Sequence, residues 1–234
     1  AVVLATGGIE SFRPVLLGTR HMAVAGHYGA AHAAFNILEA GGNAVDAGVA
    51  AGIALGVLQS DLVNVAGVAP IMIYLADKRE VLTISGLGTW PRATDPEVFR
   101  KQHGGHIPDG ILRTVVPAAP DAWIMALEHY GTMSFGDCAA AAIRFAGDGF
   151  PMYELMADMV AMHESDYARW PSSAAVYLPG GKPPRAGEIF VQADLGRTMR
   201  FMADQEKAAA GKGRKAGLQA ARDAFYRGDI ARQI

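Results

Sequence analysis

Residues 43–58 constrain the fold more than any other stretch, because they form a long apolar segment that carries a single charged residue. Asp46 is that residue, and no charge follows it through Leu58, while Ala and Gly separate the larger apolar side chains. A helix that is apolar on every side must be buried on every side. The segment is too short and too rich in small residues for a membrane span. We therefore expect it to form the central helix of a layered core, and we expect no membrane partner.

A Gly-Gly pair separates this helix from an earlier one, which we expect to run from about Gly29 to Ala40. Gly41 is placed to adopt the left-handed conformation that ends many helices. Asn43 is placed to cap the second helix with its side chain. Asp46 lies three residues later, where a carboxylate suits the free amides and the positive end of the helix dipole. The sequence therefore predicts two helices joined by a tight break.

The composition is that of a globular protein with enough apolar residues for a core. The chain has 234 residues, of which 51% are hydrophobic and 19% charged, and we treat residues 1–234 as a single domain. The formal net charge of −2 gives no electrostatic reason to expect nucleic acid as a partner. Cys138 is the only cysteine and lies in an alanine-rich run, which predicts a buried structural thiol. The histidines lack the spacing of a metal site, and Gly86 and Gly88 lack the third glycine of a dinucleotide site, so we expect neither metal nor cofactor.

Strands, helices and Gly/Pro-rich connections follow the apolar helix. Residues 71–75 and 80–84 are apolar runs around a short polar connector, which is typical of a hairpin. Apolar residues recur at helical spacing in several later segments. We expect an extended segment over 1–20, a buried strand at 22–25, mostly loop over 92–110, a Pro/Gly-rich connector over 170–187, and a solvated basic run at 207–215. We expect helices at 121–130, 135–147, 152–163, 193–205 and 218–225.

Six short motifs, spread over most of the chain, carry a resemblance to a known family. They are 37–47 (ILEAGGNAVDA), 115–120 (VVPAAP), 128–132 (EHYGT), 146–151 (AGDGFP), 178–184 (LPGGKPP) and 223–228 (DAFYRG). This ordered set resembles the gamma-glutamyltransferase family, whose members are N-terminal nucleophile (Ntn) hydrolases. The resemblance implies an α+β fold, a four-layer αββα sandwich, to which this chain contributes a helical layer and part of the sheets.

The resemblance also implies that the nucleophile stands on another chain. Ntn hydrolases attack with a chain-starting Thr, Ser or Cys, whose free α-amine serves as the base. This chain starts with Ala1 and ends at Ile234, and its serines lack the nucleophile-elbow pattern. Family precursors cleave themselves into a large chain, which this one resembles, and a smaller chain that begins with the nucleophilic Thr. We therefore expect no catalytic residue here, a chain incomplete at its C-terminus, and a heterodimer or a dimer of heterodimers. With no leader visible, we expect the cytoplasm or the periplasm, with the cytoplasm favoured.

The loop that ends at Pro91 bears on the substrate. In the family that the chain resembles, the matching loop carries an Arg, an acidic residue, and then a Pro three residues after that pair. The Arg binds the α-carboxylate of the gamma-glutamyl group. Aligning on Pro91 puts Leu87 and Gly88 at the Arg–acid pair, and Leu has no donor for a bidentate carboxylate contact. The resemblance thus implies hydrolysis of a small-molecule amide that lacks a gamma-glutamyl group. We expect this substrate to be bound by Leu87, Gly88, Thr89 and Trp90.

Three alternatives remain open. In the first, the loop that ends at Pro91 is a plain turn, and Trp90 lies in the core. In another interpretation the enzyme is a true gamma-glutamyl transferase, in which Arg92 or Arg113 supplies the carboxylate contact. In the third, the chain belongs to a catalytically inactive binding protein of the same fold. His27, at the start of the first helix, is expected to hydrogen-bond to the backbone rather than to act in a site.

Overall fold

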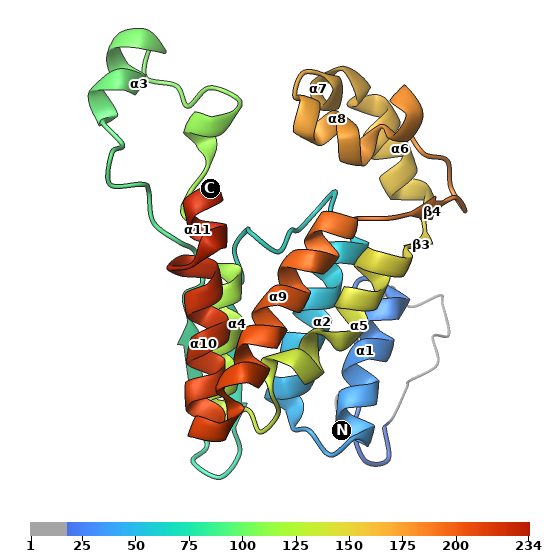
Figure 1. Cartoon of the computed structure of the whole chain (residues 1–234), viewed down its shortest axis with the longest axis vertical. Coiled ribbons are helices and arrows are strands. Elements are labelled where there is room, and N and C mark those ends of the chain that lie inside the picture. The colour runs from blue at the N-terminus through green and yellow to red at the C-terminus, as the bar shows by residue number, and fades with distance from the viewer. Residues whose placement is uncertain (1–17) are drawn as a thin grey trace, which may run out of the picture.

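The structure is a layer of long helices with two small sheets and two outlying groups of short helices (Figure 1). It is a computed structural model that describes residues 18–234, so nearly all of the extended segment predicted over 1–20 lies outside the described residues. The long helices are α1 (Tyr28–Glu39), α2 (Ala44–Leu58), α4 (Ala119–Tyr130), α5 (Phe135–Asp148), α9 (Ala193–Ala209) and α10 (Arg214–Tyr226).

The shorter elements connect or extend this layer. They are β1 (Ile71–Leu75), β2 (Glu80–Ile84), α3 (Pro96–Gln102), η1 (Ile111–Arg113), β3 (Phe150–Pro151), α6 (Glu154–Met162), α7 (Glu164–Ala168), α8 (Pro171–Tyr177), η2 (Pro179–Gly181), β4 (Ile189–Phe190), η3 (Ala210–Lys212) and α11 (Asp229–Gln233). Over residues 18–234, no helix has the length and apolar character that crossing a membrane requires.

α2 is the central helix of the layer, as predicted. It packs against α1, α4 and α5, while α9 packs on α5 and α10 packs on α9 (Figure 1). Ile53, Val57 and Leu58 are completely buried. Burying each of these side chains stabilises the fold by roughly 1.5–3 kcal/mol relative to leaving it exposed.

The break between α1 and α2 also forms as predicted. Gly41 has a φ of 93°, and the chain turns back there. The Asn43 side chain accepts hydrogen bonds from the backbone N–H of Val45 (2.8 Å) and of Asp46 (3.1 Å). In return the Asp46 carboxylate accepts from the backbone N–H of Asn43 at 2.9 Å. This reciprocal capping box satisfies amides that would otherwise lack partners at the start of a buried helix.

The two sheets of the described residues are both antiparallel pairs. β1 and β2 form the predicted hairpin, with Ile73 opposite Leu82 and Tyr74 opposite Val81. Successive side chains alternate between the faces of the hairpin. Ile73 is therefore buried on the inner face, while Met72 and Tyr74 are exposed on the outer face. β3 and β4 pair Phe150 with Phe190 at the base of the α6–α8 group.

Some local predictions are wrong. Residues 22–25 form no strand, because no described segment pairs with them, and Val24 is 68% exposed. The region 92–110 is mostly loop, as predicted, but it contains α3, and the connector 170–187 contains α8. Both helices have a Pro in the first turn, where its missing N–H costs nothing.

The basic run at 207–215 is only partly a solvated segment. Arg214, at the start of α10, is partly buried. Its guanidinium donates to the carbonyl oxygen of Leu127 at 2.6 Å and to that of Met133 at 3.0 and 3.1 Å. Arg214 therefore joins α10 to the end of α4 and to the turn that follows it.

Candidate functional site

The loop between β2 and Pro91 is fixed on both sides by hydrogen bonds to its own chain. The carbonyl oxygen of Gly86 accepts from the N–H of Ala69 at 2.9 Å, and that of Thr89 accepts from the N–H of Val116 at 2.8 Å. Gly86 has a φ of 55° and Gly88 a φ of 74°.

Side chains do not fit at either glycine. A Cβ atom at Gly86 would lie 2.1 Å from the carbonyl oxygen of Ala69, and one at Gly88 would lie 2.3 Å from that of Val116. Both positions require glycine for conformation and for space. The groups that closely approach the backbone of Gly86 and Gly88 are therefore carbonyl oxygens of the same chain.

The four residues predicted to bind substrate lie in different surroundings. Leu87 is 55% exposed, so it is available to a ligand or to another chain. Trp90 is 41% exposed and packs its ring edge-on against Phe99, with the ring centroids 5.4 Å apart. Trp90 is therefore not a core residue, and it is the one of the four that lines a large cavity of the described residues.

This cavity, which we call the Trp90 cavity, has a volume of about 560 Å³. Its walls come from parts of the segments 90–99 and 111–117, from α10, and from α11 with the Ile234 that follows it. Most of the lining is apolar, and the side chain of Asp95 is the charged group among the lining residues. Cavities of this size and character typically hold small molecules.

Three polar side chains of the Trp90 cavity, those of Asp95, Thr114 and Tyr226, have partners within the protein. The hydroxyl of Thr114 donates to the carbonyl oxygen of Ile111 at 2.7 Å, and the Asp95 carboxylate accepts from the N–H of Glu97 at 2.9 Å. The hydroxyl of Tyr226 donates to the carbonyl oxygen of Pro117 at 2.8 Å. Burial raises the pKa of Tyr226 to about 12, so this phenol stays protonated near neutral pH.

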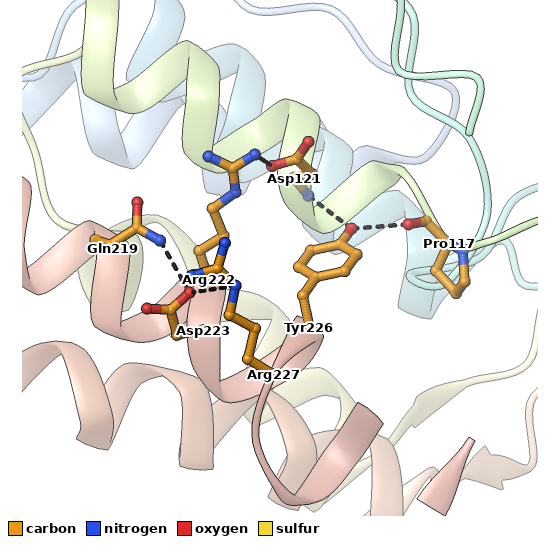
Figure 2. A network of polar contacts seen from close by, with 7 residues as sticks. All are labelled: Pro117, Asp121, Gln219, Arg222, Asp223, Tyr226 and Arg227. Atoms are coloured by element: carbon orange, nitrogen blue, oxygen red, sulfur yellow. Dashed lines mark hydrogen bonds and ion pairs between the residues drawn. The ribbon is translucent and has the colours of Figure 1, made fainter. Parts of the chain in front are cut away.

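Tyr226 also belongs to a polar network that joins α4 to α10 (Figure 2). Its oxygen accepts from the N–H of Asp121 at 3.1 Å, and the carboxylate of Asp121 pairs with Arg222 at 2.5 Å. Asp223 accepts from Gln219 at 2.9 Å and lies 3.6 Å from the Arg227 guanidinium. These side chains line a second, polar cavity of about 520 Å³. The two arginines and two aspartates balance each other, so the network has no net charge.

Sequence reasoning did not find this network. The signal was present in motifs 115–120 and 223–228, because Tyr226 of the later motif hydrogen-bonds to Pro117 of the earlier one. More than 100 residues separate the two motifs along the chain, so their contact could be seen only in the fold.

A second pair of motifs meets at Asp46, which is completely buried. Its carboxylate accepts from the N–H of Thr132 at 2.9 Å, from the Thr132 hydroxyl at 2.7 Å and from the N–H of Met133 at 3.1 Å. The amide of Asn43 donates to the carbonyl oxygen of Tyr130 at 2.7 Å. Burial acts to raise the pKa of Asp46, but the hydrogen bonds from Asn43, Thr132 and Met133 outweigh it and hold the pKa below its usual value. The hydrogen bonds between motifs 37–47 and 128–132 therefore join the start of α2 to the end of α4 and stabilise the helical layer.

The remaining candidate groups have structural surroundings. Cys138 is 1% exposed, and burial raises the pKa of its thiol far above the usual range, as expected for a structural thiol. His27 accepts from the N–H of Gly29 at 3.0 Å, which is the predicted bond to the backbone, and burial lowers its pKa. Arg113 pairs with Asp109 at 2.8 Å, and neither it nor Arg92 lines the Trp90 cavity. Within residues 18–234, no three metal-ligating side chains form a group.

The sequence profile of one family, described as gamma-glutamyltranspeptidase, matches residues 30–234. The "Acylase ACY 1 proenzyme" of Pseudomonas sp. (strain SE83) is 34% identical over 196 residues, which are 80% of this chain and 35% of that protein. The "Glutathione hydrolase-like YwrD proenzyme" of Bacillus subtilis (strain 168) is 28% identical over 222 residues, 94% of this chain and 39% of the relative. The chain thus spans a little over a third of the length of these curated relatives.

Solved structures show the same relationship. A structure of LmbA2991HD superposes with a TM-score of 0.87 at 33% identity, covering 94% of this chain and 38% of the other. Helicobacter pylori gamma-glutamyltranspeptidase superposes with a TM-score of 0.80 at 26% identity, covering 94% of this chain and 60% of the other. The predicted α+β fold, with a helical layer and part of the sheets of a four-layer αββα Ntn-hydrolase sandwich, is confirmed. The chain belongs to the gamma-glutamyltranspeptidase family of Ntn hydrolases.

Proposed function

We propose that this chain is the large, non-nucleophile part of a self-cleaving Ntn amidohydrolase or acylase. The observation that carries this proposal is the match of residues 30–234 to the family, together with relatives whose names include acylase and proenzyme. The nucleophilic Thr stands on a smaller chain from the same precursor. The assembled enzyme is a heterodimer or a dimer of heterodimers, and residues 1–234 act as one domain in it.

The reaction is acyl transfer to water through a covalent intermediate. The hydroxyl of the Thr attacks the amide carbonyl, and its free α-amine takes the proton. The amine of the substrate leaves with that proton, and water then releases the acyl group from the Thr oxygen. This chain contributes no reacting group to these steps and instead forms one wall of the substrate site.

The substrate is an amide whose acyl group is not gamma-glutamyl. Leu87 stands where the family's clamp for the α-carboxylate has an Arg, and a Leu cannot pair with a carboxylate. The alternative donors, Arg92 and Arg113, do not line the Trp90 cavity, and Arg113 is engaged by Asp109. Leu87, Gly88, Thr89 and Trp90 form the wall of the substrate site nearest the acyl group.

Mass spectrometry of the protein expressed from its complete coding sequence tests the proposal. We expect a second chain that begins with Thr and copurifies with this one. A protein without any second chain starting with Thr, Ser or Cys would rule the proposal out and favour a binding protein of the same fold. Turnover of a gamma-glutamyl anilide as fast as that of the best alternative acyl anilide would instead favour a true gamma-glutamyl transferase.

A further inference from the structure

We propose that the Trp90 cavity binds the acyl group of the substrate, and that this group is a neutral, apolar chain or ring. The inference rests on the proposed amidohydrolase function and deepens it by naming the chemical class of the acyl group. Nothing in the proposed function itself requires the cavity to be used, because the four loop residues alone would form a wall.

The cavity is built from parts of the chain that are far apart in sequence. Trp90 and Phe99 form one wall, Ile111 and Val116 a second, and Tyr226 part of a third. α3 lies at the tip of a long loop that extends away from the helical layer, and none of its residues is buried (Figure 1). The contact between the Trp90 and Phe99 rings therefore holds the part of this loop that lines the cavity in place.

The lining is unusually apolar for a surface that water reaches. Ile111 is 76% exposed, while Leu112 and Val116 are each 40% exposed, and all three line the cavity. Exposed apolar side chains that gather in a concave region mark binding sites, whereas isolated ones do not. A volume of about 560 Å³ is in the range of small-molecule pockets and takes a phenyl ring or an alkyl chain of several carbons.

Charge determines which small molecules fit. Asp95 is the charged residue of the lining, and no lining residue is a cation. A carboxylate on the ligand would therefore lose water, meet no positive partner and face a like charge. The hydroxyls of Thr114 and Tyr226 already donate to backbone carbonyl oxygens, which leaves the hydroxyl of Thr94 as the one lining hydroxyl available to a ligand. One hydroxyl does not replace the water that a buried carboxylate loses.

The cavity also adjoins the loop at the position of the family's clamp. Trp90 belongs to both, and the hydrogen bond between the Thr89 carbonyl oxygen and the Val116 N–H fixes the loop to the cavity wall. In the proposed site, a substrate held at Leu87 extends its acyl group past Trp90 into the cavity.

Two acyl anilides of equal length test the charge argument in the processed enzyme. Pentanoyl and glutaryl anilides both have five-carbon acyl groups, but the first ends in a methyl group and the second in a carboxylate. We expect kcat/KM for the pentanoyl compound to be higher by about tenfold or more. Within the series from acetyl to pentanoyl, each added methylene should raise kcat/KM about fourfold. A flat series, or equal turnover of the glutaryl compound, would overturn the proposal.

A matched pair of variants tests the location. Val98 lines the cavity, so Val98→Trp should fill it and remove the dependence on chain length. Lys101 lies on the same helix with its side chain 74% exposed and outside the lining, so Lys101→Trp adds a similar ring and should keep the dependence. Thermal unfolding of both variants checks that each is folded.

A binding measurement separates this proposal from the proposed function. The ketone 2-hexanone has the butyl chain and carbonyl of a pentanoyl amide but no amide bond, and NMR titration gives its Kd without turnover. We expect Val98→Trp to weaken binding at least tenfold and Lys101→Trp to leave it unchanged. Failure of the wild-type protein to bind the ketone, or partner-chain side chains filling the cavity in a structure of the assembled enzyme, would overturn the inference. The absence of a second chain beginning with Thr, Ser or Cys would instead count against the proposed function.

Discussion

At the scale of single residues, Asp46 of motif 37–47 and Leu87 of the loop before Pro91 have different roles. Asp46 is a structural residue, because its buried carboxylate accepts hydrogen bonds from N–H and O–H donors and pairs with no cation within residues 18–234. A carboxylate with several such donors stays ionised in the fold in spite of burial. Leu87 differs, because its side chain is largely exposed and it is one of the residues that we propose to bind the substrate. We therefore expect substitution of Asp46 to lower stability and substitution of Leu87 to lower activity.

Asp46→Asn should lower the free energy of unfolding at pH 7 by about 2–3 kcal/mol, because the amide cannot accept from all of the donors. The folded state holds the pKa of Asp46 below its unfolded value of about 3.9, so the ionised carboxylate stabilises the fold above that pH. This contribution is lost as the pH falls toward the folded pKa. Urea unfolding at pH 7 and pH 3 should show the difference from wild type shrinking at the lower pH.

The control for Asp46→Asn is Asp204→Asn, since Asp204 is exposed on α9. That change should stay within about 0.5 kcal/mol of wild type at both pH values. A difference between wild type and Asp46→Asn that is equally large at pH 3 would show that the carboxylate's charge is not what stabilises the junction.

Leu87→Arg should lower kcat/KM on the native amide by about tenfold or more, because a charged side chain would face an apolar acyl group. The free energy of unfolding should change by less than about 0.5 kcal/mol, since Leu87 is exposed. Leu155→Arg is the control, because Leu155 is 54% exposed and lies on α6, away from the loop. Equal activity of wild type and Leu87→Arg would place the loop outside the substrate site.

At the scale of elements, sequence reasoning succeeded where the signal is local and periodic. The capping residues of α2 and the hairpin turn lie next to the segments they define, so both could be predicted. Short helices were missed where Pro was taken only as a breaker, as at Pro96 and Pro171. The prediction of a strand at 22–25 was wrong because strand formation depends on a pairing partner that the local sequence does not reveal.

Arg214 gives a prediction at this scale, because it joins α10 to α4 and to the turn after α4 through carbonyl oxygens. Arg214→Lys should lower the free energy of unfolding by about 1–2 kcal/mol, since an ammonium group cannot reproduce the fork that reaches Leu127 and Met133 together. Arg200→Lys on exposed α9 surface should stay within about 0.5 kcal/mol of wild type. Chemical denaturation of both variants measures this, and equal stabilities would mean that a point charge suffices at position 214.

At the scale of the whole molecule, sequence reasoning named one residue that lines the Trp90 cavity but did not predict the cavity itself. Trp90 was found through the resemblance, whereas Phe99, Val116 and Tyr226 come together only when the chain folds. Phe99 lies in no motif, and the motifs that contain Val116 and Tyr226 do not reveal that the two residues line one cavity. A site assembled from distant segments is therefore visible in sequence only at the residues that a motif marks.

The outer face of the hairpin gives the last prediction, which concerns how this chain meets the rest of its enzyme. Met72 and Tyr74 are 75% and 62% exposed, and Val81 beside them is 62% exposed. An isolated two-stranded hairpin is only marginally stable in water, and in a four-layer αββα sandwich this face packs against a second sheet. We therefore expect the three side chains to be buried in the assembled enzyme.

Met72→Lys should then lower the stability of the assembled enzyme by about 2 kcal/mol and reduce the amount of second chain that copurifies, because a charge would enter a buried apolar layer. Met162→Lys is the matched control, since Met162 is 73% exposed but lies on α6 in an outlying group of helices (Figure 1). Thermal unfolding and quantitative gel analysis of both variants measure the effect. If Met72→Lys proves as harmless as Met162→Lys, the outer face of the hairpin is a free surface and the second sheet packs elsewhere.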